Sequence, residues 1–293
     1  MANRDTMAAF ITVLFDGVAY GSLLFVISVG MSVTMGLMRF INLAHGAFAM
    51  FGGYTACVLA QRWGLSMFAA LPVVLVGFAV VGAVLERVVY RWVSKTRPLD
   101  QVLLTIGIAF IATGLATYIW GPYQRALPLP AVLTGQLHVL GVDLGIYRMF
   151  LIGMVVAITA SLHVLIERTR FGAQLRAAVD QPDAGAGLGI PVDRVFTGSF
   201  ALGSGLAALG GVLGVDVLGL DPNFTFHYMV YFLLVVVVGG QGSIVGSAAA
   251  AVALGVFDVV GKYYVPSIGA FLIYALMVVL LLVFPHGLFR RGR

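Results

Sequence analysis

Long apolar runs dominate this 293-residue chain and leave few folds open to it. A helix needs about 20 apolar residues to cross a bilayer, and runs of this order extend over Phe10 to Met38, Ser66 to Val89, Leu99 to Trp120 and Val195 to Val217. Hydrophobic residues make up 61% of the chain and charged residues 10%, whereas a soluble domain is about 25% charged. The sequence lacks the regular alternation of a membrane β-barrel. It therefore predicts an all-α polytopic membrane protein.

Further apolar runs complete the prediction. They cover Ala47 to Gln61, Met149 to Ile166, Val230 to Lys262 with an interruption in its middle, and Ile268 to Phe284. Together the runs predict about eight to nine transmembrane helices, with two broken or re-entrant segments, in a single permease domain over residues 1–293. Nine crossings would place the N-terminus outside the cell, and eight would place it inside.

The charged residues are concentrated in one segment. The chain has 17 Lys and Arg and 12 Asp and Glu, and eight of these lie between Glu167 and Arg194. Cytoplasmic loops carry an excess of Lys and Arg, so we expect this segment to be cytoplasmic, together with Arg87 to Arg97 and the tail with Arg290, Arg291 and Arg293. Gly121 to Arg148 has few cations and is placed outside. The net charge of +5 is a topology signal and does not indicate nucleic-acid binding.

Two places combine glycines with polar side chains inside an apolar run, Asn42 to Gly53 and Gly239 to Ser247. A helix break at membrane depth must be covered by protein or line a cavity, because lipid offers no hydrogen bonds. Transporters place such breaks in both halves of the chain and bind substrate between them. We therefore expect a substrate pathway beside these candidate residues: Asn42, His45, Gly46, Gly239, Gly240, Gly242 and Ser243. A simple turn between two helices is the alternative for each break.

The first break suggests a role for each of its residues. Asn42 can pair with both an N–H and a C=O group of exposed backbone. His45 is expected to be neutral, since no carboxylate lies near it in sequence. Gly46 would let the chain turn without a side-chain clash. The competing interpretation is that Asn42 and His45 only cap a helix at the inner surface.

The sequence contains no pattern that would support catalysis or energy coupling by this chain alone. Asp16, Asp216 and Asp258 are the acids within or near the predicted spans, and they form no evident proton relay. No phosphate-binding loop, metal-ligand spacing or nucleophile elbow is present. Cys57 is the single cysteine, so an internal disulfide is impossible. We expect a membrane subunit that is not an enzyme and binds no cofactor or metal.

The charged segment also carries an amphipathic pattern. Phe171, Leu175, Ala178 and Val179 fall on one face of a short helix, with Arg176 and Asp180 opposite as an i, i+4 pair. An apolar face of this kind favours docking of a soluble protein over a simple solvated connector. The candidate docking residues within 167–194 are Phe171, Leu175, Arg176, Val179, Asp180, Leu188, Gly189 and Ile190.

Several stretches resemble permeases of ATP-binding-cassette importers of the branched-chain amino acid (LivH) class. They are RAAVDQPDAGAGLGIPVDRV (Arg176 to Val195), GLMRFINLAHGAFAMFGGY (Gly36 to Tyr54), LERVVYR (Leu85 to Arg91), LLTIGIAF (Leu103 to Phe110) and VVVVGGQGSIVGSAAAA (Val235 to Ala251). The resemblance covers nearly the whole chain. Two departures stand out, because Trp92 replaces a common proline and the Ala-Gly run at 184–187 has unusually small side chains.

The resemblance implies an importer in a bacterial inner membrane. In it, two homologous permeases form the pore, two cytoplasmic ATPases bind Mg and ATP, and a periplasmic or extracellular binding protein delivers substrate. The substrate would be a branched-chain amino acid, or a related small solute such as urea or an amide. The alternative from a different class is a passive channel for a small polar solute, but such a channel has no need of the charged docking segment.

Overall fold

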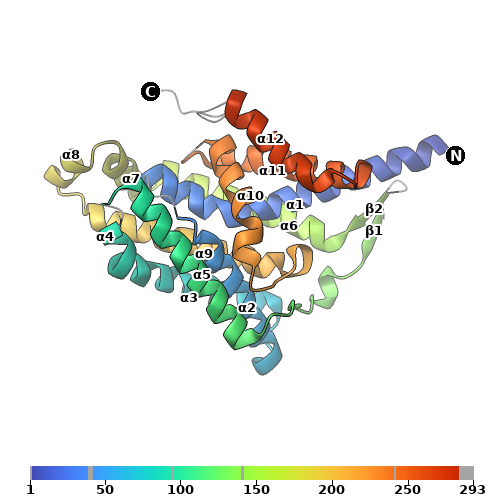
Figure 1. Ribbon diagram of the computed structural model, residues 1–293, viewed down its shortest axis with the longest axis horizontal. Helices are drawn as coiled ribbons and strands as arrows, with labels where there is room; N and C mark the ends of the chain where they lie inside the picture. The colour runs from blue at the N-terminus through green and yellow to red at the C-terminus, as the bar shows by residue number, and fades with distance from the viewer. Residues whose placement is uncertain (1, 39–41, 94–95, 140–141, 241, 284–293) are drawn as a thin grey trace.

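The computed structural model describes residues 2–38, 42–93, 96–139, 142–240 and 242–283 (Figure 1). Within these ranges, six helices are long and apolar enough to cross a membrane, and Phe224–Gly239 and Phe271–Leu280 are shorter apolar helices. A further helix, α2 (His45–Trp63), is 19 residues long but more polar. The polytopic helical fold and its eight to nine helical segments are confirmed.

The remaining elements follow the apolar runs of the sequence. In chain order they are α1 (Ala2–Met38), α3 (Met67–Leu85), the π-helix η1 (Glu86–Tyr90), α4 (Arg91–Val93), α5 (Pro98–Trp120), the 3₁₀ turn η2 (Ala131–Leu133), β1 (Gln136–Val139), β2 (Val142–Gly145), α6 (Ile146–Arg168), α7 (Arg170–Asp180), α8 (Pro182–Gly187), α9 (Val192–Leu218), α10 (Phe224–Gly239), α11 (Ile244–Tyr264) and α12 (Gly269–Val283). Strands β1 and β2 form one antiparallel hairpin.

The core is built around α1 and α9. Every residue from Gly21 to Met35 of α1 and from Gly203 to Val215 of α9 is buried. A helix that is covered on all sides must lie among other helices and not against lipid, and the small residues of α9 allow this. A Cβ at Gly30 would lie 2.2 Å from the carbonyl oxygen of Gly203, so the two backbones touch.

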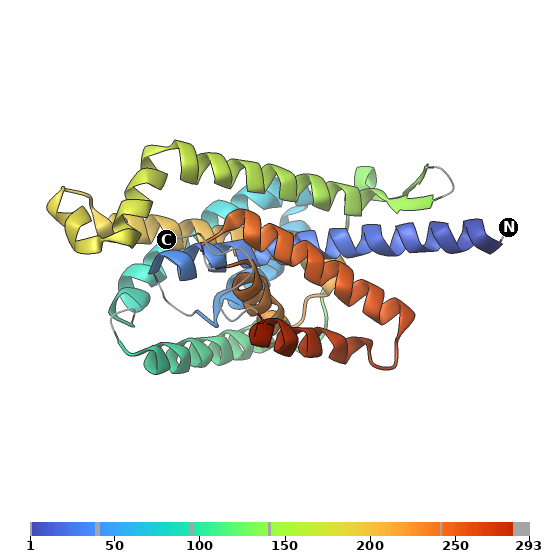
Figure 2. The ribbon, with the colours of Figure 1, turned by 90° about the horizontal axis from the view of Figure 1, so that it is seen from above.

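The two ends of the molecule differ in character. Both views place α4, α7 and α8 at one end, and the β1–β2 hairpin and the start of α1 at the other (Figures 1 and 2). The two segments predicted to be cytoplasmic therefore share one end, and Gly121 to Arg148 reaches the opposite end. The start of α1 lies on the hairpin's side, which is the arrangement that nine crossings predict. The arginines at 290–293 lie outside the described residues.

Three details correct the sequence analysis. Gly52 and Gly53 lie inside α2, so the first break ends at Ala44. The second break ends at Ser243, because that side chain caps α11 by accepting a hydrogen bond from Gly246 N at 3.0 Å. The apolar run Ser66 to Val89 stops being α-helical at Leu85 and continues as the π-helix η1. Caps and local hydrogen bonds decide these boundaries, and hydropathy does not report on them.

Candidate functional site

The first break is held by buried polar contacts. Asn42 and His45 are both buried, and the Asn42 side-chain oxygen accepts a hydrogen bond from Ala44 N at 3.1 Å. The His45 Nε2 atom lies 3.0 Å from the carbonyl oxygen of Ile27 on α1. A carbonyl oxygen only accepts, so Nε2 carries the hydrogen in this contact. Asn42 thus pairs with one backbone N–H group and His45 with one backbone C=O group, both inside the protein, while the Asn42 amide nitrogen has no hydrogen-bond partner among the described residues.

Gly46 has a different role from the predicted one. It lies in the first turn of α2, where a Cβ would meet Phe232 and Thr225 of α10 at 3.2 Å. Glycine is therefore needed for close approach between α2 and α10, and the turn does not depend on it. Since α10 leads directly into the second break, this contact links the two breaks.

The second break joins α10 to α11. Gly240 and Gly242 adopt left-handed backbone conformations, with φ of 83° and 80°, which favour glycine. Gly242 N donates to the carbonyl oxygen of Ser32 on α1 at 3.1 Å. A Cβ at Gly239 would lie 2.5 Å from Ser247 Cα, so the chain doubles back tightly there.

The two breaks thus meet on one helix. Their partners Ile27 and Ser32 are five residues apart on α1, a rise of about 7.5 Å. The Ser247 hydroxyl adds a hydrogen bond to the Ser32 hydroxyl at 2.8 Å. Breaks 200 residues apart in sequence are therefore brought together, and protein backbone pairs with Asn42 Oδ1, His45 Nε2 and Gly242 N. The arrangement suits a pair of hinges and offers no reactive group.

The predicted docking segment forms two short helices at the end of the molecule shared with α4 (Figure 1). Thr169 caps α7 by accepting a hydrogen bond from Gly172 N at 3.2 Å. Arg176 donates to the carbonyl oxygen of Ile166, at the end of α6, and its guanidinium lies 3.9 Å from a Glu167 carboxylate oxygen. Arg176 therefore fixes α7 beneath α6. Its predicted partner Asp180 has a side chain outside what the structure describes.

The apolar face of α7 is covered by the chain itself, contrary to the argument made from its amphipathic pattern. Leu175 is 1% exposed and packs with Ala178 and Val195. Phe171 and Ile190 pack against the same cluster, and Val179 is half-buried. Leu175 therefore cannot touch a partner directly, because α9 already occupies its face. The pattern predicted burial correctly but could not identify the covering element.

Among the described residues of the docking segment, the exposed large apolar side chain is Leu188, just after α8. Its side chain is 83% exposed, and Gly189 beside it has φ of 83°, which lets the chain turn back toward α9. The structure therefore leaves Leu188 available for a partner, while Phe171, Leu175 and Ile190 shape the segment from within.

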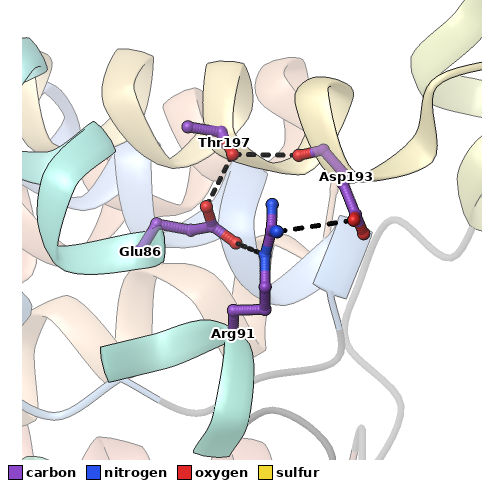
Figure 3. A network of polar contacts seen from close by, with 4 residues as sticks. All are labelled: Glu86, Arg91, Asp193 and Thr197. Carbon is purple, nitrogen blue, oxygen red and sulfur yellow. Dashed lines mark hydrogen bonds and ion pairs between the residues drawn. The ribbon is translucent and has the colours of Figure 1, made fainter. Parts of the chain in front are cut away.

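Sequence analysis missed a polar network near the same end of the molecule. Glu86 of η1, Arg91 of α4, and Asp193 and Thr197 of α9 converge there (Figure 3). Thr197 Oγ1 donates to Glu86 Oε2 at 2.6 Å, and Arg91 Nη1 lies 3.4 Å from Asp193 Oδ2. The available signal was the acid inside the LERVVYR motif, which follows an apolar run directly.

The acids within the spans are paired or exposed. Asp258 is buried on α11 and bonds Lys262 at 2.6 Å, and Asp16 pairs with Arg148. Asp216 is exposed. Among the described residues, no group of three or more His, Cys, Asp or Glu side chains could hold a metal ion. The described part of the chain therefore shows neither a carboxylate relay nor a metal centre.

Comparison with known proteins identifies the family. Residues 13–281 match the family described as branched-chain amino acid transport system / permease component. The chain is 28% identical over 299 residues to the high-affinity branched-chain amino acid transport system permease protein LivH of Escherichia coli (strain K12), with 96% of each chain covered. It is 26% identical over 295 residues to the corresponding protein BraD of Pseudomonas aeruginosa, with 95% of each covered.

A partial relative extends the range of related permeases. The xylose/arabinose import permease protein XylH of Sulfolobus acidocaldarius is 28% identical over 163 residues, which are 53% of this chain and 44% of that protein. The family match, by contrast, runs from α1 into α12 and includes both breaks, the docking segment and the Glu86 network. The chain is a multi-pass inner-membrane protein that belongs to the family of branched-chain amino acid transport system permease components.

Proposed function

We propose that this chain is one of two membrane subunits of an ATP-driven importer and that it moves branched-chain amino acids into the cell. The observation that carries the proposal is the family match over residues 13–281. The relatives that match over the full length, LivH and BraD, are named for high-affinity transport of branched-chain amino acids. The relative named for pentose import covers about half of this chain, so it supports a sugar substrate more weakly.

The same proposal assigns the energy source to other subunits. A P-loop motif is missing from the sequence, so ATP and Mg would bind to two cytoplasmic ATPases. One of them would dock on 167–194 with the exposed Leu188 as its apolar contact, since this residue directly follows α8, which lies at the end shared with α4. A second, homologous permease would complete the pore, and a binding protein would deliver substrate at the hairpin end.

The two breaks would border the substrate pathway as hinges. His45 and Gly242 tie them to Ile27 and Ser32 of α1, and Gly46 ties α2 to α10. Broken helices shift more easily than continuous ones, and half-helix ends carry partial charges that suit both groups of a zwitterion. In this proposal the buried side chains of Asn42 and His45 set the geometry of the pathway without contacting substrate.

Reconstitution tests the proposal. The complex is purified from native membranes through a tag on this chain and placed in liposomes with Mg and ATP inside and the binding protein outside. We expect labelled leucine to accumulate above its external concentration with ATP but not with a non-hydrolysable analogue. Equilibration of leucine or urea without ATP would indicate a passive channel instead. Accumulation of xylose in place of leucine would show that the substrate is a sugar and not an amino acid.

A further inference from the structure

A buried carboxylate joins two segments that are far apart in sequence. Glu86 is 2% exposed, and its closest partner, the Thr197 hydroxyl, is 111 residues away. Arg91 lies beside both carboxylates of the network, with Nε 3.9 Å from Glu86 Oε1 and Nη1 3.4 Å from Asp193 Oδ2 (Figure 3). Buried charge pairs often add little to stability, because desolvation offsets the attraction between the charges. A role in positioning explains the network better than a role in stability.

Each side of this contact carries its own substitute partner. The Thr197 hydroxyl has a single hydrogen to donate, and it lies 2.6 Å from Glu86 Oε2 and 2.9 Å from the backbone oxygen of Asp193, one turn back on its own helix. Glu86 likewise has Arg91 on its own side of the contact. If the two sides separate, Thr197 can turn to Asp193, and Glu86 keeps a cation. Neither polar group is left without a partner.

The surrounding backbone suits such a separation. Glu86 begins the five-residue π-helix η1, and π-helical turns are common at functional sites in helices. One turn earlier, α3 and α9 are in close contact, because a Cβ at Gly82 would lie 1.8 Å from Ser204 Oγ. The Ser204 hydroxyl oxygen lies 3.1 Å from the carbonyl oxygen of Phe78 on α3 and 2.9 Å from that of Phe200 on its own helix. The Gly82–Ser204 contact can therefore act as a pivot, with the Glu86 network at the free end.

The network also lies between the docking segment and the first break. Asp193 is the second residue of α9, which follows α8 after four residues. On the other side, the Tyr90 ring packs against Phe200 at 4.8 Å between ring centroids, and Phe200 packs against Phe48 of α2 at 6.0 Å. Contacts thus run from the docking segment, through α9 and η1, to the start of α2 beside the first break. An element with two arrangements that both sites bias can couple them.

We propose that the contact between Glu86–Arg91 and Asp193–Thr197 is a separable joint that opens and closes once in each transport cycle. In this mechanism a movement of the docking segment reaches α9 first, and the joint decides whether η1 and α3 follow it. The inference rests on the proposed function, because it requires an ATPase on the docking segment. Glu86 and Thr197 are positioning residues in it, and neither touches substrate.

The first experiment measures the amount of leucine imported per ATP hydrolysed in reconstituted complexes that are confirmed to be assembled. Thr197→Val removes the hydrogen that both arrangements use, and Thr197→Ser retains it. We expect import per ATP to fall about tenfold in Thr197→Val and Glu86→Gln, within the range typical of coupling free energies, and to be restored in Thr197→Ser. The double variant should lose no more than either single one. The control Asp100→Asn, from the Arg97–Asp100 pair at the start of α5, should couple normally.

A purely structural role would lower the yield of assembled complex and leave import per ATP unchanged in the complexes that form. If Thr197→Val shows that outcome, the proposed joint is wrong. This conclusion does not depend on Glu86→Gln, which can be left out if that variant does not insert into the membrane. A wild-type complex that hydrolyses ATP without importing leucine contradicts the proposed function, and it does so before any variant is compared. The two failures are therefore distinguishable.

The second experiment locks the joint reversibly. In a Cys57→Ala background, Arg91→Cys and Asp193→Cys are linked with a short bifunctional thiosulfonate, and import is measured before and after reduction. The two substitutions remove the Arg91–Asp193 ion pair, so the unlinked variant sets its own reference level of import. A joint that must open predicts that linking stops this remaining import and that dithiothreitol restores it to the reference level. The matched control links Arg97→Cys to Asp100→Cys, which lie on one side of the joint. The proposal is overturned if the variant linked at 91 and 193 imports leucine as fast before treatment with dithiothreitol as after it.

Discussion

The imidazole of His45 donates from Nε2 to the carbonyl oxygen of Ile27 across 3.0 Å, which ties the first residue of α2 to the buried middle of α1. Within the described part of the chain, no side chain caps α2, whose N-cap residue is Ala44. The start of α2 therefore depends on a tertiary contact, and displacement of α1 would carry the first break with it.

Replacement of His45 tests this dependence. His45→Phe removes the donor and retains a ring, so we expect a loss of about 0.5–1.5 kcal/mol, the net value of one buried hydrogen bond. His45→Gln places an amide donor at a similar reach and should recover most of that loss. Thermal unfolding of the purified protein in detergent measures both variants. Equal melting temperatures for the two would show that the hydrogen bond does not hold α2 in place.

The docking segment gives a prediction that separates folding from docking. Leu175→Asp places a carboxylate where the side chain is 1% exposed, which costs several kcal/mol and should loosen α7 from α9. Leu188→Asp changes a side chain that is 83% exposed and should leave the fold intact. Limited proteolysis at 167–194 distinguishes them, because we expect new cleavage in Leu175→Asp alone.

Both variants should nonetheless lose the ATPase during purification, Leu175→Asp through disorder of the segment and Leu188→Asp through the contact itself. The exposed Gln174→Asp on α7 serves as the control for added charge. Normal ATP-driven uptake by Leu188→Asp would remove this residue from the docking surface.

The sequence predicted the features that depend on one segment at a time. Hydropathy and length located the apolar helices. The polar glycine clusters located both breaks. These signals are local, because a span, a packed face and a break are each encoded by adjacent residues.

Features that depend on two distant segments were not predictable in the same way. The pattern of α7 showed an apolar face, but the cover came from Val195 on α9. Glu86 was visible as an acid after an apolar run, but its partner Thr197 is 111 residues away. The role of Gly46 was assigned to a turn because its neighbours on α10 were unknown. Which helices pack against each other is a property of the tertiary structure, and it cannot be predicted from the local pattern of a single sequence.

Glycine contacts between buried helices make the third prediction. A Cβ at Gly30 would lie 2.2 Å from the carbonyl oxygen of Gly203, so Gly30→Ala must push α1 and α9 apart. Overpacking of this kind costs about 1–3 kcal/mol. Gly77→Ala is the matched control, because nothing lies within 4 Å of the added methyl group and alanine favours a helix by up to about 1 kcal/mol. We expect a lower melting temperature and a smaller monodisperse peak in size-exclusion chromatography for Gly30→Ala, and neither change for Gly77→Ala.

The last prediction concerns the ion pair of α11, where Asp258 is buried and bonds Lys262 at 2.6 Å while the Tyr231 hydroxyl donates to its other oxygen at 3.4 Å. Lys262→Met removes the cation and leaves a buried carboxylate with one tyrosine donor. Loss of one partner of a fully buried pair costs about 3–5 kcal/mol, and the half-exposed Lys262 ammonium reduces the expected loss to roughly 2–3 kcal/mol.

The double variant Asp258→Asn, Lys262→Met removes both charges, so its loss should be smaller than that of Lys262→Met alone. The expected order follows from desolvation, because the cost of the single variant comes from the carboxylate that stays buried. Melting temperatures of the two single variants and the double variant measure the coupling. If the two changes add without coupling, the buried carboxylate does not depend on Lys262, and the Tyr231 hydroxyl and the surrounding backbone must stabilise it instead.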